Sequence, residues 1–520
     1  MGVYLFLFFF VGVYSFYAPE GYIQIATNKY LFFRSMCLIT AGIMVPLIGL
    51  RCIVLFFERS PKKRRPRISL TDLFMLLFLA VNMISFFFTE YREEALWGTS
   101  GWYMGFAMHL FFIGIYFMVS RFYDGKIDVL PIFMGITFVI FLWGLLNRFS
   151  VYPIDMQYDS DSFISSMGNI NWFCGFWSVF FVTGVVLYIV TERRSLRIFS
   201  GIYSVLALGL GAVEGSDSGF VAMAVVFFFL FLVSFRKTEY MKRWLEEGIF
   251  YCAACQVMRI IVLILPESLS REDVTSKWML GNLTLAALML FVVLRVWLEN
   301  RDKNYKKYIK KTGTGEGSAA TELIWEWSWL KYAVIGLTAA AAAVYLILLV
   351  INTRTPGILG PLSKYPVLLF DGHWGSNRGA TWRDGLLIYR TLGWRQRLFG
   401  AGQDCFSIHG YGVPELAARF AEEWPGSRLT NAHNECITYL VNLGIFGMLS
   451  FIGIFWSSFK RLVERAAKEP MCYVFAASAL SYFFHNQFSF SQVLNTPYMF
   501  MMLGLGESLM RRAGAAGEPE

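Results

Sequence analysis

The chain has 520 residues, of which 56% are hydrophobic, and it carries a formal net charge of +9. Its mean hydropathy of +0.50 lies well above that of ordinary soluble domains, which excludes a soluble globular protein. No basic and aromatic binding module accompanies the positive charge, so nothing indicates a nucleic-acid partner.

Apolar runs recur along nearly the whole chain, and each is long enough to cross a hydrocarbon core about 30 Å thick. They predict an all-α, polytopic membrane protein with about 14 transmembrane helices. The first run lacks a basic leader and a small-residue cleavage site, so we interpret it as a retained helix and not a signal peptide. The predicted spans are 2–18, 36–57, 69–88, 101–120, 127–146, 171–191, 195–213, 218–235, 246–266, 277–297, 327–351, 433–457, 470–487 and 494–510.

Lysine and arginine in the short loops predict the orientation, because these residues resist translocation. The run "ERSPKKRRPR" (58–67) holds six of them and residues 295–311 hold seven. Both fall on one side if fourteen helices alternate. This predicts that both termini lie in the cytoplasm.

The spans divide the chain into four parts. We expect N-terminal transmembrane helices in 1–160, central transmembrane helices in 161–351, a large external loop in 352–432 and C-terminal transmembrane helices in 433–520. The loop is the only sizeable part outside the predicted membrane spans.

The predicted external loop prefers arginine, with eight arginines to one lysine. A guanidinium offers a planar fork of donors to phosphate or carboxylate, which suits an anionic ligand at a membrane surface. The alternative is that these arginines contact lipid headgroups or pair with the six carboxylates of the same loop.

Two short amphipathic helices are predicted in this loop. Asn377 is a candidate cap for a helix that runs to about Leu392 and carries Arg383 and Arg390 on one face. The "GAG" at 400–402 predicts a tight turn close to another backbone. The stretch 414–424, "PELAARFAEEW", has the pattern of a helix lying on the membrane plane.

The stretch "NAHNECITYLVNLGIFG" (431–447) begins the next span. If it forms one continuous helix capped by Asn431, then His433, Gly444 and Gly447 share a face, and the glycines let a neighbouring helix approach. A helix N-terminus disfavours positive charge, so His433 is expected to be neutral, as a general base must be. The alternative is a histidine that only anchors the helix at the interface.

Four elements of the sequence resemble the O-antigen ligase and O-antigen polymerase superfamily. "HNECITYLVNLGIFG" fits its histidine, asparagine and paired-glycine signature, "GNINWF" (168–173) its Gly-Asn-x-Asn element, "NRGATWRDGLLIY" its arginine and tryptophan element, and "LFGAGQDCF" (398–406) the following glycine pair. The resemblance covers roughly 160–460. One departure is "GSDSGF" (215–220), where the ligases have an arginine between serine and glycine.

The resemblance implies a membrane glycosyltransferase that moves a glycan from an undecaprenyl diphosphate carrier to a hydroxyl of a glycan, lipid, protein or wall-polymer acceptor, with membrane lipid as its surroundings. It implies a bacterial cytoplasmic (inner) membrane as the location, and no cofactor and no metal. It assigns catalysis to His433 and Arg378, and the motif positions are Gly168, Asn169, Asn171, Gly400, Gly402, Gly444 and Gly447.

Further substrate contacts follow from the residues themselves. We expect Arg383, Arg390 and Asn434 to bind substrate. Asp217 and Ser218 are predicted either to contact sugar hydroxyls or to cap the span at 218–235.

Two other classes of protein remain as alternatives to a transferase. A lipid-linked glycan flippase or another polytopic transporter has a comparable number of spans, but such folds usually show two related halves, which this sequence lacks. A membrane scaffold without chemistry leaves the arginine, glycine and histidine elements unexplained.

Overall fold

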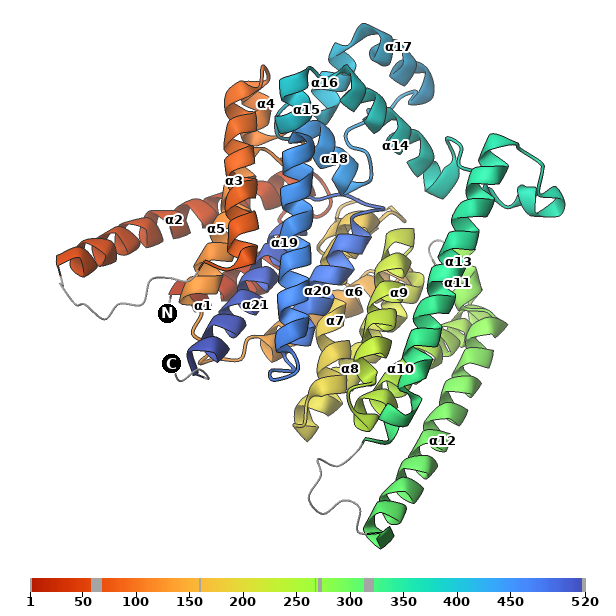
Figure 1. Cartoon of the computed structure of the whole chain (residues 1–520). Coiled ribbons are helices and arrows are strands. Elements are labelled where there is room, and N and C mark those ends of the chain that lie inside the picture. The colour runs from red at the N-terminus through yellow and green to blue at the C-terminus, as the bar shows by residue number, and fades with distance from the viewer. Residues whose placement is uncertain are drawn as a thin grey trace.

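The computed structural model describes residues 2–57, 68–158, 160–266, 268–269, 274–312 and 322–516 (Figure 1). The basic run 58–67, used above to predict the orientation, lies outside the described residues. Within the described part the chain is almost entirely helical, as the apolar runs predict.

The first half contains ten helices and one small hairpin. The helices are α1 (Gly2–Leu7, continued by π and 3-10 turns η1, Phe8–Val13, and η2, Tyr14–Phe16), α2 (Ile25–Phe57), α3 (Leu70–Phe88), α4 (Arg92–Trp97), α5 (Phe106–Phe122), α6 (Leu130–Arg148), α7 (Ile170–Val190), α8 (Arg194–Val213), α9 (Asp217–Ser234) and α10 (Thr238–Ile264). The hairpin pairs β1 (Phe163–Ile164) with β2 (Gly168–Asn169) in antiparallel register, Phe163 opposite Asn169.

The second half contains helices joined by turns and loops, and no strand among the described residues. Its elements are α11 (Val274–Met279), α12 (Asn282–Thr312), η3 (Leu323–Trp327), α13 (Ser328–Arg354), η4 (Gly360–Lys364), η5 (Pro366–Leu368), α14 (Trp374–Thr391), α15 (Trp394–Phe399), α16 (Phe406–Gly412), α17 (Pro414–Glu423), α18 (Glu435–Asn442), α19 (Gly444–Arg465), α20 (Cys472–His485) and α21 (Thr496–Ala516).

Ten helices of the described part are long and apolar enough to cross a membrane: α2, α3, α6, α7, α8, α9, α10, α12, α13 and α19. Three more apolar helices, at Gly2–Phe16, Phe106–Phe122 and Cys472–His485, are shorter. Helical segments overlap all fourteen predicted spans, but the count of fourteen is not confirmed.

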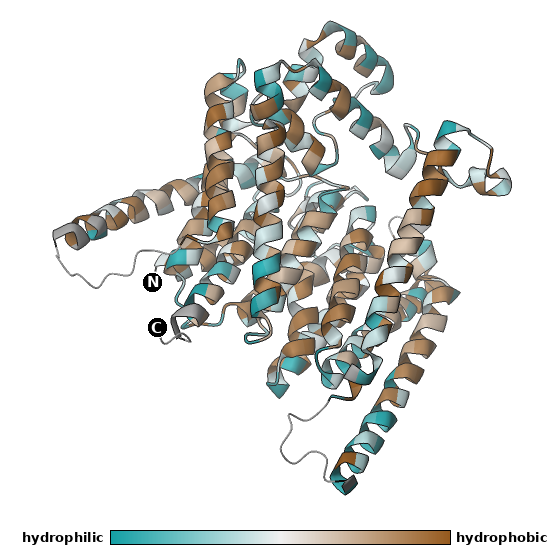
Figure 2. Ribbon diagram, viewed as in Figure 1, coloured by the Kyte–Doolittle hydropathy of each residue, from teal (hydrophilic) through white to brown (hydrophobic). Residues whose placement is uncertain are grey.

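Helix α7 forms the centre of the bundle. Its apolar window is 94% buried, against 0% for α13 and 11% for α12. Helices α8 and α20 pack along α7, and α21 packs along α5. Figure 2 shows long apolar stretches on α12 and α13; α12 packs along α10 on one side, and the mostly unburied apolar surface of both helices suits contact with membrane hydrocarbon.

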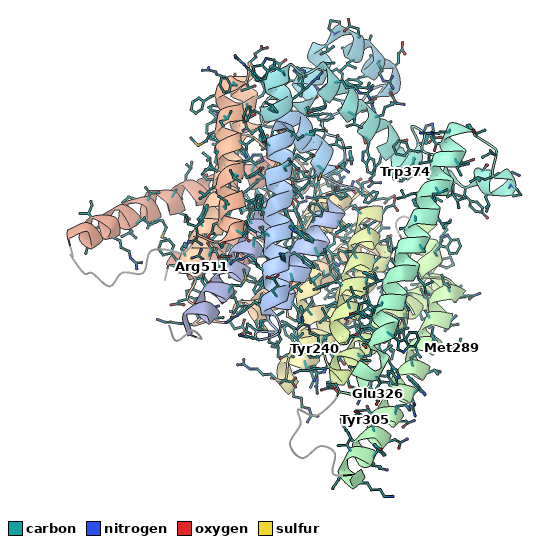
Figure 3. The ribbon with its side chains drawn as sticks, viewed as in Figure 1. Tyr240, Met289, Tyr305, Glu326, Trp374 and Arg511 are labelled. Carbon is teal, nitrogen blue, oxygen red and sulfur yellow. The ribbon has the colours of Figure 1, made fainter. Side chains whose placement is uncertain are left out.

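The segment between α13 and α19 gathers at one end of the bundle. Helices α14 to α17 lie over that end, whereas both termini and the basic end of α12 lie at the opposite end (Figure 1). Trp374, at the start of α14, and Arg511, close to the termini, mark these two levels (Figure 3).

Candidate functional site

A cavity of about 340 Å³ lies where α7, α9 and α14 begin. It collects five of the residues expected from the sequence: Asn169, Asn171, Asp217, Arg378 and His433. The remaining lining residues are Ser162, Ile170, Gly215, Ser216, Ser376, Asn377, Thr381 and Trp424. Residues separated by more than 250 positions in the chain thus share one site.

Three helices, α7, α9 and α14, begin at this cavity, with residues of their first turns in its lining. The Asn169 side chain accepts from the N–H of Asn171 at 2.9 Å and so caps α7. At the start of α9, Gly215 has φ +88°. The unpaired N–H groups and partial positive charge of a helix start favour an anion, so three of them at one cavity predict an anionic ligand.

Arg378 is the only arginine or lysine among the described residues that line the cavity. The side chain is buried, its Nε donates to the carbonyl of Phe488 at 2.6 Å and its Nη1 to the carbonyl of Gly375 at 2.7 Å. Burial lowers the pKa of Arg378, and Asp217, 3.8 Å from Nη1, opposes that shift. Nη2 has no hydrogen-bond partner among the described residues, which leaves this end of the guanidinium for a ligand.

The start of α14 differs from the expectation that Asn377 caps it. Gly375, Ser376 and Asn377 all have positive φ, near 59°, 59° and 69°. The left-handed turn places Ser376 and Asn377 against the cavity, and the Ser376 hydroxyl donates to Asp217 at 3.2 Å. Regular helix therefore starts at Arg378 and ends at Thr391, one residue before the predicted end.

His433 lies in the turn before α18 and lines the cavity with its ring. Its φ of 47° is left-handed, and its backbone N–H donates to Asn431 Oδ1 at 2.8 Å. The ring packs edge-on against Phe490 at 4.9 Å. Neither ring nitrogen has a hydrogen-bond partner in the described part of the chain. Burial, reinforced by the charge of Arg378, lowers the pKa of His433 to about 4, so the ring is neutral near pH 7.

The single helix predicted from His433 to Gly447 is wrong. Helix α18 ends at Asn442, and Gly444, with φ +69°, starts α19. Asn434, and not Asn431, is the cap, since its Oδ1 accepts from the N–H of Ile437 at 3.0 Å. His433 precedes both helices, so it shares no helix face with the glycines.

The motif glycines serve close backbone contacts. A Cβ on Gly400 would overlap the carbonyl of Asn442, and one on Gly444 would overlap the backbone of Leu398. Gly402 has φ +128°, and its N–H donates to the carbonyl of Asn442 at 3.1 Å. The turn at 400–402 therefore fits against the α18–α19 break, as its "GAG" predicts.

The other two glycines have different neighbours. Gly168, with φ +84°, turns the hairpin beside Ile25. A Cβ on Gly447 would overlap the side chain of Leu443 in the adjoining turn, so Gly447 does not form the predicted groove for a neighbouring helix.

Four of the expected substrate contacts lie outside the cavity. Arg383 pairs with Glu423 and Asp384. Arg390 is exposed near the end of α14. Asn434 donates to the carbonyl of Gln487 at 3.0 Å in addition to its capping bond. Ser218 is buried against Ser216, 2.8 Å away.

Several residues of the site were missed from the sequence, among them Thr381, Trp424 and Phe490. Trp424 and Thr381 line the cavity, and Phe490 supports the His433 ring. The Trp424 indole N–H donates to Asp384 Oδ2 at 3.2 Å, which ties α17 to α14. Thr381 lies three residues after Arg378 on the same helix face, so the position of Arg378 could have predicted that Thr381 also lines the site.

Comparison with known proteins gives no functional assignment for this chain. No protein-family model and no curated protein sequence matches the chain.

Proposed function

We propose that the chain is a membrane glycosyltransferase of the O-antigen ligase or polymerase type. It moves a glycan from an undecaprenyl diphosphate carrier to an acceptor hydroxyl at the outer face of the cytoplasmic membrane. The observation that supports this most is the cavity in which Arg378, a neutral His433 and three helix N-termini converge.

The donor diphosphate fits the electropositive side of this cavity. Arg378 is held by two backbone carbonyls, so its guanidinium is oriented before any ligand arrives. The diphosphate gains negative charge as the bond to the sugar breaks. Helix N-termini and a guanidinium stabilise that charge, which lowers the barrier to departure of the diphosphate.

The proposed reaction is a displacement at the anomeric carbon of the donor sugar. The acceptor oxygen forms a new bond to that carbon while its proton passes to a ring nitrogen of His433. The bond between the anomeric carbon and the diphosphate oxygen breaks, and the diphosphate keeps the electron pair beside Arg378. Holding the two substrates in one cavity supplies a further part of the rate.

The low pKa of His433 belongs to the cavity without a donor. Its cause is burial next to Arg378, and a bound diphosphate offsets that positive charge. Donor binding therefore makes the ring a stronger base at the stage when the acceptor proton must leave.

Asp217 directly precedes Ser218, which occupies the position where the resembling ligases carry an arginine. Its carboxylate is half-exposed, lines the cavity and lies 3.8 Å from Arg378. We propose that it accepts hydrogen bonds from sugar hydroxyls. This departure favours an acceptor other than a lipopolysaccharide core.

The test is a reaction with purified protein in detergent micelles, a lipid-linked oligosaccharide donor and a set of candidate acceptors. We expect the donor to be consumed and a glycosylated product to appear by mass spectrometry. A flippase leaves the donor intact in micelles, because it needs two leaflets. Intact donor with every acceptor class, by folded protein, contradicts the proposal.

A further inference from the structure

A second, smaller pocket lies close to the His433 ring and is separate from the first cavity. Its volume is about 20 Å³, which is room for one water molecule or one ion. Phe490 lines this pocket and also packs against His433. The pocket is formed by the loop before α5, the turn between α15 and α16, helix α18 and the loop before α21.

Two carboxylates line this pocket. Asp404 Oδ2 accepts the backbone N–H groups of Thr99 at 2.7 Å and Met104 at 3.1 Å, and Glu435 Oε2 accepts that of Ser491 at 2.6 Å. Neither carboxylate forms an ion pair with a lysine or arginine of the described residues. Burial raises the pKa of Asp404 and of Glu435 to about 7, and the charge of Glu435 adds to the shift of Asp404.

Two amide oxygens in the same pocket also lack donors. Gln403 Oε1 and Asn442 Oδ1 are buried without a hydrogen-bond partner in the described part of the chain. The Gln403 amide cannot simply turn over, because its Nε2 donates to the backbone carbonyl of Asn82 at 2.6 Å and to its side-chain oxygen at 3.2 Å. Buried acceptors without donors are rare in folded proteins and indicate a missing partner.

We propose that this pocket binds one hard divalent cation of the calcium class through Asp404, Glu435, Gln403 and Asn442. Carboxylate and amide oxygens are the ligands that Ca²⁺ accepts in flexible geometry, and its charge balances the two carboxylates. Mg²⁺ keeps several water molecules, for which a pocket of about 20 Å³ has no room.

A zinc ion does not fit the same donors. No cysteine lines the pocket among the described residues. The one lining histidine, His109, uses its Nδ1 for the carbonyl of Gly105 at 3.0 Å and its Nε2 for the hydroxyl of Tyr439 at 3.4 Å.

The cation is a clamp outside the reacting cavity. It ties the turn of Gln403 and Asp404 to the first turn of α18, directly after His433. Its binding is measured without glycan transfer, so this inference stands or fails apart from the proposed function.

The test uses the full chain, stripped of metal with a chelator, in a zwitterionic detergent. Terbium, a luminescent substitute for Ca²⁺, is titrated while tryptophan is excited, because Trp102 lines the pocket. We expect sensitised emission that Ca²⁺ displaces, and a Ca²⁺-dependent rise in Tm. No displaceable emission together with a Tm that ignores Ca²⁺ overturns the proposal, and indicates a carboxyl pair that holds a proton instead.

Variants locate the site. Asp404→Asn and Glu435→Gln are expected to weaken Ca²⁺ competition by at least about tenfold, as loss of a metal-site group does. Trp102→Phe is expected to lose emission and keep the Ca²⁺-dependent Tm rise, which covers the case in which an acid variant fails to fold. The matched control is Glu423→Gln, a carboxylate of the same segment that pairs with Arg383 and Arg419. Equal weakening by the control overturns the placement of the ion.

Discussion

At the residue scale, the neutral His433 is the base that the proposed reaction needs. A pKa of about 4 means that protonation removes the base only in acid. The ring is held by Phe490 and by the Asn431 turn, but its nitrogens are left for substrate. The position and the protonation state of His433 are therefore both those of a general base.

Replacing this histidine tests that role. We expect His433→Ala to reduce transfer by about 100- to 10,000-fold, the usual contribution of a general base. In the wild type, kcat/KM for donor should be flat from about pH 6 to 8 and fall toward pH 4, as the ring becomes charged. The alanine variant should lack this acid limb.

The control is His409→Ala, because His409 lies outside the cavity and its Nε2 is 3.4 Å from Thr391 Oγ1. We expect its transfer rate to match the wild type. A folded His433→Ala protein with a rate within severalfold of wild type contradicts the base assignment.

Of the eight arginines in the segment 352–432, Arg378 is the one that lines the cavity. We expect Arg378→Ala to weaken use of the donor by about 10- to 100-fold, the worth of a hydrogen bond to a charged group. Arg378→Lys should recover only part, because an ammonium does not reproduce the planar fork that reaches Phe488, Gly375 and ligand together. Initial rates against donor concentration measure this.

Arg395→Ala is the matched control for Arg378. Its guanidinium is exposed and stacks on Trp394, 5.2 Å from the ring centre. Loss of donor affinity in both variants would point to a general charge effect of the segment and not to a site.

At the element scale, the break between α18 and α19 positions the histidine. Gly444 adopts a left-handed backbone conformation that ends α18, at a point where the backbone of Leu398 lies close to it. Gly400 in turn lies close to the backbone of Asn442. The prediction that His433 shares a helix face with Gly444 and Gly447 failed because it assumed one continuous helix. The signal that could have found the break is a glycine directly after an apolar helical run, which typically ends a helix.

This break gives a stability prediction. Gly444→Ala should lower Tm, because φ +69° costs a side chain about 1–2 kcal/mol and its Cβ overlaps the Leu398 backbone. Gly336→Ala in α13 is the control, since nothing lies within 4 Å of its added Cβ and alanine favours helix. The Tm of each variant is measured by thermal unfolding in micelles. Equal Tm values for the two variants would contradict the close contact between Gly444 and the Leu398 backbone.

At the scale of the whole molecule, the two ends of the bundle differ in character. Helices α14 to α17 lie at one end and the termini at the other (Figure 1), and the first turn of α14 lines the cavity. A lipid-linked donor enters at a membrane surface, so the side on which the cavity opens decides which donors it meets.

Cysteine labelling measures that side. In a cysteine-free background, we expect Glu415→Cys, exposed on α17, to react with an impermeant maleimide in intact cells. Lys303→Cys, exposed on the basic end of α12, should react only after permeabilisation, because lysine-rich loops stay in the cytoplasm. The reverse pattern contradicts the proposed orientation.

The sequence by itself determined the helical membrane architecture, because hydrophobic length and local period are properties of neighbouring residues. It also singled out Arg378 and His433, although only by resemblance. The tertiary structure decided which arginine faces the cavity, since Arg378 meets Asp217 and Phe488 across 161 and 110 positions of chain (378 − 217 and 488 − 378). It also decided which buried oxygens lack donors. Those features depend on packing between distant segments, which no local pattern encodes.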